Sequence, residues 1–384
     1  MDFIDLKTQQ KAIETELNHR IASVLAHGQY IMGPEVAELE RILADYVGAK
    51  HCVTVASGTE ALLIALMALG VGPGDEVITT PFTFIATAEV IVLLGATPVF
   101  VDVDPLTANI NPALISEKIS SKTKAIIPVS LYGQVANLEE INAIAMANGE
   151  IPVIEDAAQS FGAIANGKRS CGASMIGCTS FFPSKPLGCY GDGGALFTSD
   201  DVIAQAAREI RVHGQSKRYV HTRIGVGGRM DTLQCAIVLA KWPRFEWEVK
   251  SRGSIGAEYT RLIHAQVSGA KPLSHDEVGR ELAGLRTLTL NPDYTSVYAQ
   301  YTVLVPNRDA VQSVLQAAGV PTAVHYPVPI NAQPAYRGLR DSGVTIVSDW
   351  MAKHVMSLPM GPDLSSSDMS YIVEKLSGLF ERLE

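Results

Sequence analysis

Between about residues 34 and 245, short apolar runs alternate with longer amphipathic stretches. Apolar runs of roughly four to eight residues are typical of buried strands, and apolar positions three or four residues apart are typical of helices. The predicted strands are His51–Val55, Glu76–Thr79, Thr97–Val101, Lys124–Val129, Ile151–Glu155, Gly177–Phe182 and Gly194–Thr198. The predicted helices are Glu35–Val47, Glu60–Leu69, Phe84–Leu94, Leu138–Asn148 and Asp200–Val212. Because nearly continuous apolar strands need cover on both faces, the pattern predicts an α/β fold with a mostly parallel central sheet.

The pattern changes after Pro243, where a long charged helix and then separated strands and helices indicate an α+β lobe. The predicted elements are helices Phe245–Ala265, Arg308–Ala318 and Ser366–Phe380 and strands Gln300–Val305 and Thr322–Val324. One core usually stops growing at roughly 250–300 residues, and this chain has 384. We therefore predict a large domain at residues 1–245, which includes an N-terminal arm, and a smaller C-terminal domain at residues 246–384.

Charge limits the class of partner. The formal net charge is −9, from 40 acidic residues against 31 lysines and arginines. General nucleic-acid binding needs a basic surface that displaces counterions, so no nucleic-acid partner is expected. A small anionic substrate is compatible with this composition, because it needs only a few local positive groups.

Cysteine usage and hydropathy indicate the compartment. The five cysteines form no CxxC pair, so neither a disulfide framework nor a metal site is indicated. Met1–Asp5 lacks the basic and apolar pattern of a secretory signal, and the apolar stretches Ala61–Gly74 and Val90–Val101 are too short to span a bilayer. We expect a cytoplasmic protein that has reduced thiols and binds neither metal nor membrane.

Lys185 is the first candidate for chemistry. It ends the run Ser180–Lys185, just after a predicted buried strand, and four glycines follow within Gly188–Gly194. Lysine is seldom buried unless it is paired or functional. Desolvation favours the neutral amine, which is the nucleophile that forms a Schiff base. The alternative is a surface lysine in a glycine-rich loop, and the motif taken alone favours that alternative.

Two carboxylates, Glu155 and Asp156, end an apolar strand. The carboxyl ends of strands in an open parallel sheet face the ligand crevice. An aspartate at that place can keep a ring nitrogen protonated through a charge-assisted hydrogen bond, and a protonated pyridine makes pyridoxal phosphate (PLP) an electron sink. The alternative is that Asp156 caps the next helix, which is a common role for this residue type.

A phosphate site and a stacking ring complete the pattern. Ser57–Thr59 lies between a strand and a helix, where free N–H groups and the helix dipole favour an anion, and Ser180 adds a hydroxyl. The spacings of a P-loop and of a dinucleotide fingerprint are both absent from the sequence. Phe82 and Phe84 follow the strand Glu76–Thr79 and offer rings for stacking on a cofactor. Ordinary core packing is an equal alternative for Phe84 and a weaker one for Phe82.

The order of these features resembles that of PLP enzymes with the aspartate-aminotransferase fold, and the chain as a whole resembles the DegT/StrS family of sugar aminotransferases. The matching stretches are Gly33–Val36, Ser57–Leu62, Pro81–Thr87, Glu155–Ser160, Ser180–Lys185, Gly191–Ala195, Arg229–Asp231 and Val324–Pro327. They span nearly the whole chain. The resemblance implies PLP fold type I, in which the large domain binds the cofactor.

The resemblance implies a role for each matching residue. Lys185 forms the Schiff base with PLP and shuttles the proton, and Asp156 pairs with the pyridine nitrogen. Gln159 contacts the 3-hydroxyl of the cofactor, and Phe82 stacks on its ring. The phosphate is held by Gly58, Thr59 and Ser180. Some family members that are dehydratases have a histidine in place of this lysine, so Lys185 favours transamination over dehydration.

The resemblance also implies a homodimer whose active sites are shared between subunits. Gly225–Asp231 crosses to the neighbour, and Gly227 stands where the family usually has an asparagine that touches the partner's phosphate. This departure leaves open which donor replaces that asparagine. The residues expected to contact the substrate are Tyr30, Arg229, His325 and Tyr326. For His325, a purely structural histidine is the alternative.

The runs His27–Ile31, Pro183–Tyr190 and Val297–Tyr301 are similar to family members that aminate a UDP-linked 3-keto uronic acid at C3. The implied substrates are a UDP-linked keto-sugar and L-glutamate, in the biosynthesis of bacterial surface polysaccharide (O-antigen). The sequence leaves two alternatives. One is an aminotransferase for another nucleotide-linked keto-sugar, such as a 4-keto-6-deoxy sugar, and the other is a PLP-dependent sugar dehydratase.

Overall fold

The computed structural model describes residues 1–338 and 345–381. Seven strands form the central sheet, in the order β1-β9-β8-β5-β4-β2-β3, because parallel bridges from Ile126 to Val153 and from Val129 to Asp156 join two hydrogen-bonded groups. The strands are β1 (His51–Val55), β2 (Glu76–Thr79), β3 (Thr97–Phe100), β4 (Thr123–Ile127), β5 (Ile154–Asp156), β8 (Ile176–Ser180) and β9 (Gly194–Thr198). Strand β9 is antiparallel to both of its neighbours, whereas the other neighbouring pairs are parallel. The predicted mostly parallel sheet is confirmed.

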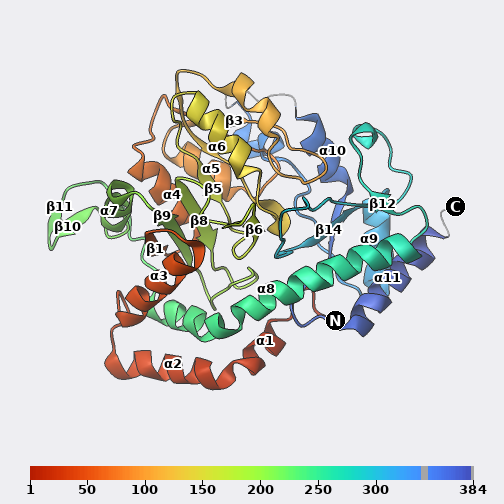
Figure 1. Cartoon of the computed structure of the whole chain (residues 1–384), viewed down its shortest axis with the longest axis horizontal. Helices are drawn as coiled ribbons and strands as arrows, with labels where there is room; N and C mark the ends of the chain where they lie inside the picture. Colours follow the sequence, from red (N-terminus) through yellow and green to blue (C-terminus); the bar gives the residue numbers. More distant parts are fainter. Residues whose placement is uncertain (339–344, 382–384) are drawn as a thin grey trace.

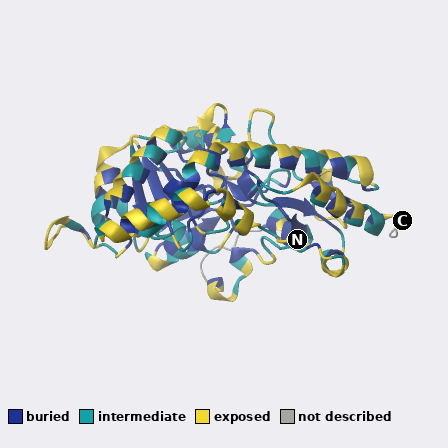
Figure 2. Ribbon diagram, turned by 90° about the horizontal axis from the view of Figure 1, so that it is seen from below, coloured by how far each residue is buried: buried dark blue, intermediate teal, exposed yellow. Residues whose placement is uncertain are grey.

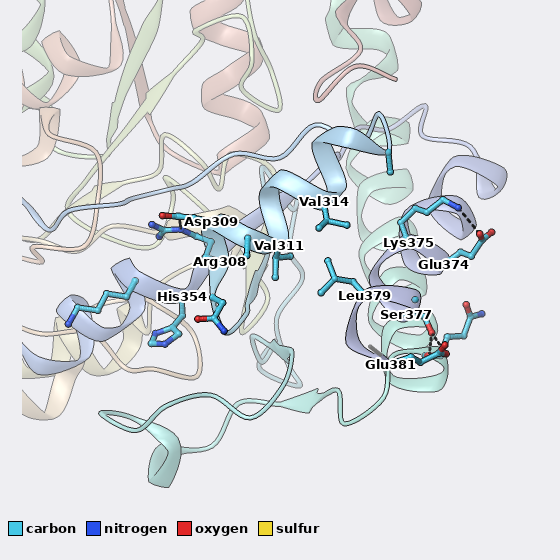
Figure 3. A pocket seen from close by; sticks show the side chains of 16 residues that line it. Arg308, Asp309, Val311, Val314, His354, Glu374, Lys375, Ser377, Leu379 and Glu381 are labelled. Carbon is cyan, nitrogen blue, oxygen red and sulfur yellow. Dashed lines mark hydrogen bonds and ion pairs between the residues drawn. The ribbon is translucent and has the colours of Figure 1, made fainter. Parts of the chain in front are cut away.

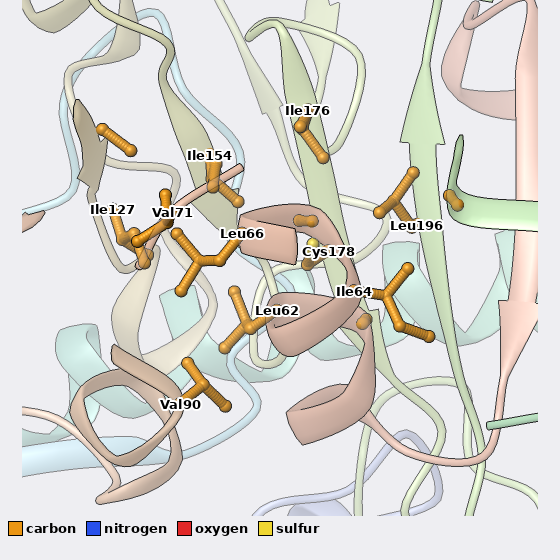
Figure 4. Close-up of a cluster of buried hydrophobic side chains, with 14 of the residues drawn as sticks. Leu62, Ile64, Leu66, Val71, Val90, Ile127, Ile154, Ile176, Cys178 and Leu196 are labelled. Atoms are coloured by element: carbon orange, nitrogen blue, oxygen red, sulfur yellow. The ribbon is translucent and has the colours of Figure 1, made fainter. Parts of the chain in front are cut away.

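Helices cover both faces of this sheet (Figure 1). They are α3 (Pro34–Val47), α4 (Gly58–Ala68), α5 (Ala86–Leu93), α6 (Leu138–Ala147), α7 (Asp201–Ile210) and α8 (Thr232–Gln266). Helix α2 (Glu14–His27) packs on α8. Successive residues of β9 point to opposite faces, because side chains alternate along a strand. Leu196 joins the cluster around α4, part of which Figure 4 shows. Phe197 joins a second cluster that contains residues of α3 and α8.

Helix α8 is 35 residues long and includes Pro243. It begins at Thr232, so the predicted start at Phe245 is wrong. Proline removes one hydrogen bond and disfavours a helix interior, but here packing of α8 against α2, α3 and α11 (Ser366–Phe380) outweighs this cost. The boundary predicted at residues 245 and 246 lies inside α8, so a division there remains a proposal. Within the described part of the chain, no helix is both long and apolar enough to cross a bilayer.

The C-terminal part has its own sheet, in the order β12-β13-β14-β15, and a separate hydrophobic cluster formed between Ile255 and Phe380. Its elements are β12 (Lys271–Pro272), β13 (Arg286–Thr287), β14 (Tyr301–Leu304), β15 (Val355–Leu358), α9 (Arg308–Ala317) and α10 (Ile346–His354). The predicted strand Thr322–Val324 is wrong. Only Ala323 pairs, with Ser357 of β15, because Val324 packs into another hydrophobic cluster instead of continuing along the sheet. Residues 339–344 and 382–384 of the predicted small domain lie outside the described residues.

The remaining elements are short. They are α1 (Leu6–Ala12) and the paired strands β6 (Ile164–Ala165), β7 (Lys168–Arg169), β10 (Gln215–Lys217) and β11 (Val220–His221). The β10–β11 hairpin projects from the body of the molecule beside α7 (Figure 1). Many helices are buried along one side and exposed along the other (Figure 2), which is the arrangement that amphipathic periodicity produces.

Candidate active site

The strand order brings the predicted chemistry to one edge of the sheet. Asp156 is the last residue of β5 and Ser180 the last of the neighbouring strand β8, while α4 begins at Gly58 shortly after β1. The strands β1, β5 and β8 run in the same direction. Their carboxyl ends therefore meet, at the place where open α/β sheets bind ligands.

Asp156 is held by two hydrogen bonds. The hydroxyl of Thr87 donates to Oδ2 at 2.8 Å, and the backbone N–H of Ala158 donates to Oδ1 at 3.2 Å. The residue is only 6% exposed. Burial raises the pKa of the carboxyl group, whereas Thr87, Ala158 and the nearby charge of Lys185 each lower it. The carboxylate is therefore oriented before any ligand arrives.

Lys185 is partly buried. Its backbone N–H donates to the carbonyl of Phe182 at 2.9 Å in a tight turn after β8. Burial lowers the pKa of the amine, and the charge of Asp156 opposes this effect. Because the two groups influence each other's pKa, Lys185 and Asp156 share one site. A lowered pKa increases the neutral, nucleophilic fraction of the amine, as Schiff-base chemistry requires.

The start of α4 approaches the end of β8 closely. A Cβ atom at Gly58 would lie 2.7 Å from Cβ of Ser180, so only glycine fits there. Ser57 caps the helix by accepting a hydrogen bond from the N–H of Glu60 at 3.1 Å, and Thr59 lies in the first turn. The first N–H groups of a helix have no partners within it and favour an anion. A phosphate group fits this cradle of backbone N–H groups and hydroxyls.

Gln159 and its neighbour Tyr132 both bond to the C-terminal part of the chain. The sequence did not predict a role for Tyr132. The backbone N–H of Tyr132 donates to Oε1 of Gln159 at 2.8 Å, and Nε2 of Gln159 donates to the hydroxyl of Tyr326 at 3.1 Å. The hydroxyl of Tyr132 donates to the carbonyl of His325. Tyr132 has a φ of 58°, in the left-handed region, where strain in non-glycine residues often marks a functional site.

His325 faces the same site. Burial lowers the pKa of its imidazole to about 4, and the charge of Lys185 lowers it further. Its Nδ1 lies 3.0 Å from the hydroxyl of Ser357. At neutral pH the ring is therefore uncharged and serves as a hydrogen-bonding group. A fixed positive charge for an anionic ligand has to come from another residue.

The expectation that Phe82 stacks on the cofactor does not fit its surroundings. Phe82 has no exposed surface and packs in a hydrophobic cluster with Val103 and Val129. Phe84 is 55% exposed, and its ring lies 6.2 Å from that of Tyr326. Stacking needs an open ring face, so Phe84 is better placed than Phe82, and which ring stacks on the cofactor stays a prediction.

Tyr30, Gly227 and Arg229 lie on two further segments that a β-bridge joins. Ile31 forms a bridge with Asp231, which places Tyr30 beside the strand-like stretch that contains Arg229. The Nε atom of Arg229 is buried and has no hydrogen-bond partner among the described residues. Gly227 is exposed, and a Cβ there would lie 3.1 Å from the ring of His213. Among the described residues, no hydrogen bond or ion pair joins Tyr30, Arg229 or Gly227 to Lys185 or Asp156.

A large surface groove of about 1160 Å³ lies elsewhere, between α9 and α11 (Figure 3). It is lined by charges of both signs, including the Lys375–Glu374 ion pair at 2.8 Å. None of the residues predicted to bind cofactor or substrate lines it. This groove and the predicted chemistry are therefore at different places.

Comparison with known proteins identifies the class of chemistry. A model of the DegT/DnrJ/EryC1/StrS aminotransferase family matches residues 11–377. The chain belongs to this family. The aminotransferase is 54% identical over 377 residues to the UDP-2-acetamido-2-deoxy-3-oxo-D-glucuronate aminotransferase of Pseudomonas aeruginosa, covering 98% of this chain and 99% of that protein. The predictions of family and of transaminase activity are confirmed.

Solved structures of relatives support the fold and the cofactor. A DegT/DnrJ/EryC1/StrS aminotransferase from Brucella abortus has a TM-score of 0.90 at 39% identity, over 99% of both chains. NtdA from Bacillus subtilis, solved with bound cofactor PMP, has a TM-score of 0.86 at 26% identity over 99% of this chain and 83% of its own. The aspartate-aminotransferase-like fold and PLP, of which PMP is the aminated form, are confirmed for this aminotransferase.

Proposed function

We propose that this PLP-dependent aminotransferase aminates C3 of UDP-2-acetamido-2-deoxy-3-oxo-D-glucuronate, with L-glutamate as the amino donor. The observation that carries this proposal is the 54% identity, over nearly the full length of both chains, to a protein named for that substrate. The buried Nε of Arg229, which has no hydrogen-bond partner among the described residues, supports an acidic sugar or donor, because arginine offers a two-pronged match to a carboxylate.

Lys185 and Asp156 are the proposed catalytic residues. PLP supplies an aldehyde that exchanges amino groups and a protonated ring that withdraws electrons. Lys185 would hold the cofactor through its amine, whose pKa is lowered by burial, and would move the proton at the reacting carbon. Asp156, aimed by Thr87 and Ala158, keeps the ring nitrogen protonated.

The other residues orient the reactants. We assign the phosphate to Gly58, Thr59 and Ser180, because a Cβ at position 58 would collide with Ser180 and a small anion fits the open helix start. Gln159, fixed by Tyr132, holds the 3-hydroxyl of the cofactor, and Phe84 covers its ring. His325 and Tyr326 contact the sugar. Proximity of the reactive groups then replaces a bimolecular encounter by a step within one complex.

We propose that a second copy of the chain completes each site. Tyr30, Arg229 and Gly227 form no hydrogen bond or ion pair with Lys185 or Asp156 among the described residues. The same region carries large exposed apolar side chains, among them Tyr30, Ile31, Tyr219 and Ile224. Exposed apolar patches on stable proteins often mark interfaces. A homodimer with shared active sites accounts for both observations.

We place the reaction in the cytoplasm, in the biosynthesis of bacterial surface polysaccharide such as O-antigen. All five cysteines are buried free thiols. Such usage supports a reducing compartment, because disulfides rarely persist there. A 3-amino uronic acid attached to UDP is a donor suited to glycosyl transfer.

A panel of keto-nucleotide-sugars tests the substrate. UDP-linked 3-keto uronate, UDP-linked 3-keto sugar without the carboxylate, and dTDP-linked 4-keto-6-deoxy sugar are each incubated with L-glutamate and the holoenzyme. We expect amination of the uronate with one 2-oxoglutarate released per sugar, and a kcat/KM at least about tenfold lower for the sugar that lacks the carboxylate. Preference for the 4-keto sugar contradicts the proposed substrate, and sugar consumption without amination indicates a dehydratase.

A further inference from the structure

Thr87 is the most deeply placed contact of the catalytic carboxylate. It lies in the first turn of α5, has no exposed surface, and donates its hydroxyl proton to Oδ2 of Asp156 at 2.8 Å. Other acceptors for this hydroxyl are the carbonyl of Phe84 and the hydroxyl of Thr83, both at 3.4 Å. Since a short hydrogen bond to a charged acceptor is the stronger one, the Thr87 proton belongs to Asp156.

We propose that Thr87 is a positioning residue, which aims the Asp156 carboxylate at the ring nitrogen of the cofactor and keeps it ionised. The inference rests on the proposed role of Asp156. The second donor to this carboxylate, the N–H of Ala158, binds the other oxygen at 3.2 Å. The two donors together fix the plane of the carboxylate, whereas Ala158 alone leaves it free to rotate.

The electrostatic surroundings give Thr87 its effect. Lys185, Glu155, Cys178 and Tyr326 all interact electrostatically with Asp156. Lys185 is the only one of these four groups that can carry a positive charge. Within the chain the buried carboxylate therefore also relies on its two hydrogen-bond donors, and the Thr87 hydroxyl is the closer of the two.

The turn at the start of α5 carries both the proposed stacking ring, Phe84, and the donor to Asp156, Thr87. Phe84 lies three residues before Thr87, and the N–H of Thr87 donates to the Phe84 carbonyl at 3.4 Å. The exposed ring of Phe84 and the buried hydroxyl of Thr87 are therefore presented by the same turn. A shift of this turn moves the stacking ring and the support of Asp156 together.

Replacement of the hydroxyl by a methyl group tests the inference in Thr87→Val. We expect PLP affinity, measured by equilibrium dialysis, to fall about ten- to a hundredfold, the factor for one hydrogen bond to a charged group. The acid limb of the pH titration of bound-PLP absorbance should move to higher pH, because the Thr87 hydrogen bond lowers the pKa of Asp156. Thr87→Ser should restore both properties.

Thr79→Val is the matched control. Thr79 is equally buried and donates at 2.8 Å, but to the backbone carbonyl of Ile127. Wild-type PLP affinity and titration in Thr87→Val overturn the inference, and so does equal impairment in Thr79→Val. Far-UV circular dichroism checks folding, and Thr87→Ala provides the same test if the valine variant does not fold. If Asp156→Asn also behaves as wild type, the site assignment itself fails, whereas impairment of Asp156→Asn alone rejects only the role of Thr87.

Discussion

Lys185 and Asp156 illustrate how burial tunes two groups in opposite directions. Burial lowers the pKa of the Lys185 amine and raises that of the Asp156 carboxyl, because both charged forms lose solvation. Their mutual attraction opposes both changes. The site therefore holds a reactive amine beside a carboxylate whose ionisation is supported by hydrogen bonds. Such opposed perturbations in one site are typical of acid–base chemistry.

At this scale the sequence was informative where a residue type is rare in its context. A lysine after a buried strand and an aspartate at a strand end are unusual enough to be noticed. The roles of Thr87 and Tyr132 could not be predicted from the sequence, because threonine and tyrosine are common in ordinary cores and only distances reveal their partners. Phe82 and Phe84 differ by two positions on one segment, and only the fold decides which ring is open.

His325 gives a prediction about pH and stability. Its folded pKa of about 4 lies below the ordinary value of 6.5, so only the unfolded chain gains a proton between these values, and stability falls as the pH falls through this window. On acidification from pH 7 to 5, His325→Gln should lose about 1–2 kcal/mol less free energy of unfolding than wild type. Urea unfolding measures the difference. The exposed His19→Gln is the control, and equal losses in both variants argue against a buried neutral His325.

At the scale of elements, the start of α4 is the proposed phosphate site. The predicted strand His51–Val55 and the helix that follows it were both found, because their apolar patterns are local. The contact between Gly58 and Ser180 joins residues distant in the chain and needed the structure. For the same reason the sequence did not predict that α8 continues through Pro243, since the packing that preserves the helix comes from α2, α3 and α11.

Gly58→Ala tests this helix start. The added methyl group would lie 2.7 Å from Cβ of Ser180, so the end of β8 and the start of α4 must separate. We expect PLP affinity to fall at least about tenfold, which corresponds to roughly 1.4 kcal/mol. Gly72→Ala is the control, because nothing lies within 4 Å of its added Cβ. Unchanged PLP binding in Gly58→Ala argues against a phosphate at this helix start.

At the scale of the whole molecule, one long helix connects a sheet that presents the cofactor site to a smaller sheet that supplies Ser357, the partner of His325. The α/β class and the mostly parallel sheet followed from the sequence, because that architecture depends on periodicity along the whole chain. The proposed dimer interface could not be located from the sequence. Apolar residues such as Tyr219 and Ile224 are indistinguishable from core residues until the fold shows them exposed.

The proposed homodimer is tested by light scattering after size-exclusion chromatography. Ile224 is 86% exposed near the β10–β11 hairpin. If a partner covers it, Ile224→Asp introduces a charge into an apolar contact and should shift the dimer towards monomer, with loss of activity. Val314→Asp, on α9 at the other end of the molecule, should remain dimeric. A monomeric wild-type enzyme with full activity contradicts the shared site.

The central claim, that the amine of Lys185 bonds to the aldehyde of PLP, is tested most directly by reduction. Borohydride treatment of the holoenzyme, digestion and mass spectrometry locate the pyridoxyl group that becomes fixed to the chain. We predict that it is found on Lys185, and that Lys185→Ala shows neither the fixed group nor the visible absorbance. A pyridoxyl group on another lysine, or none on the wild-type chain, contradicts the account.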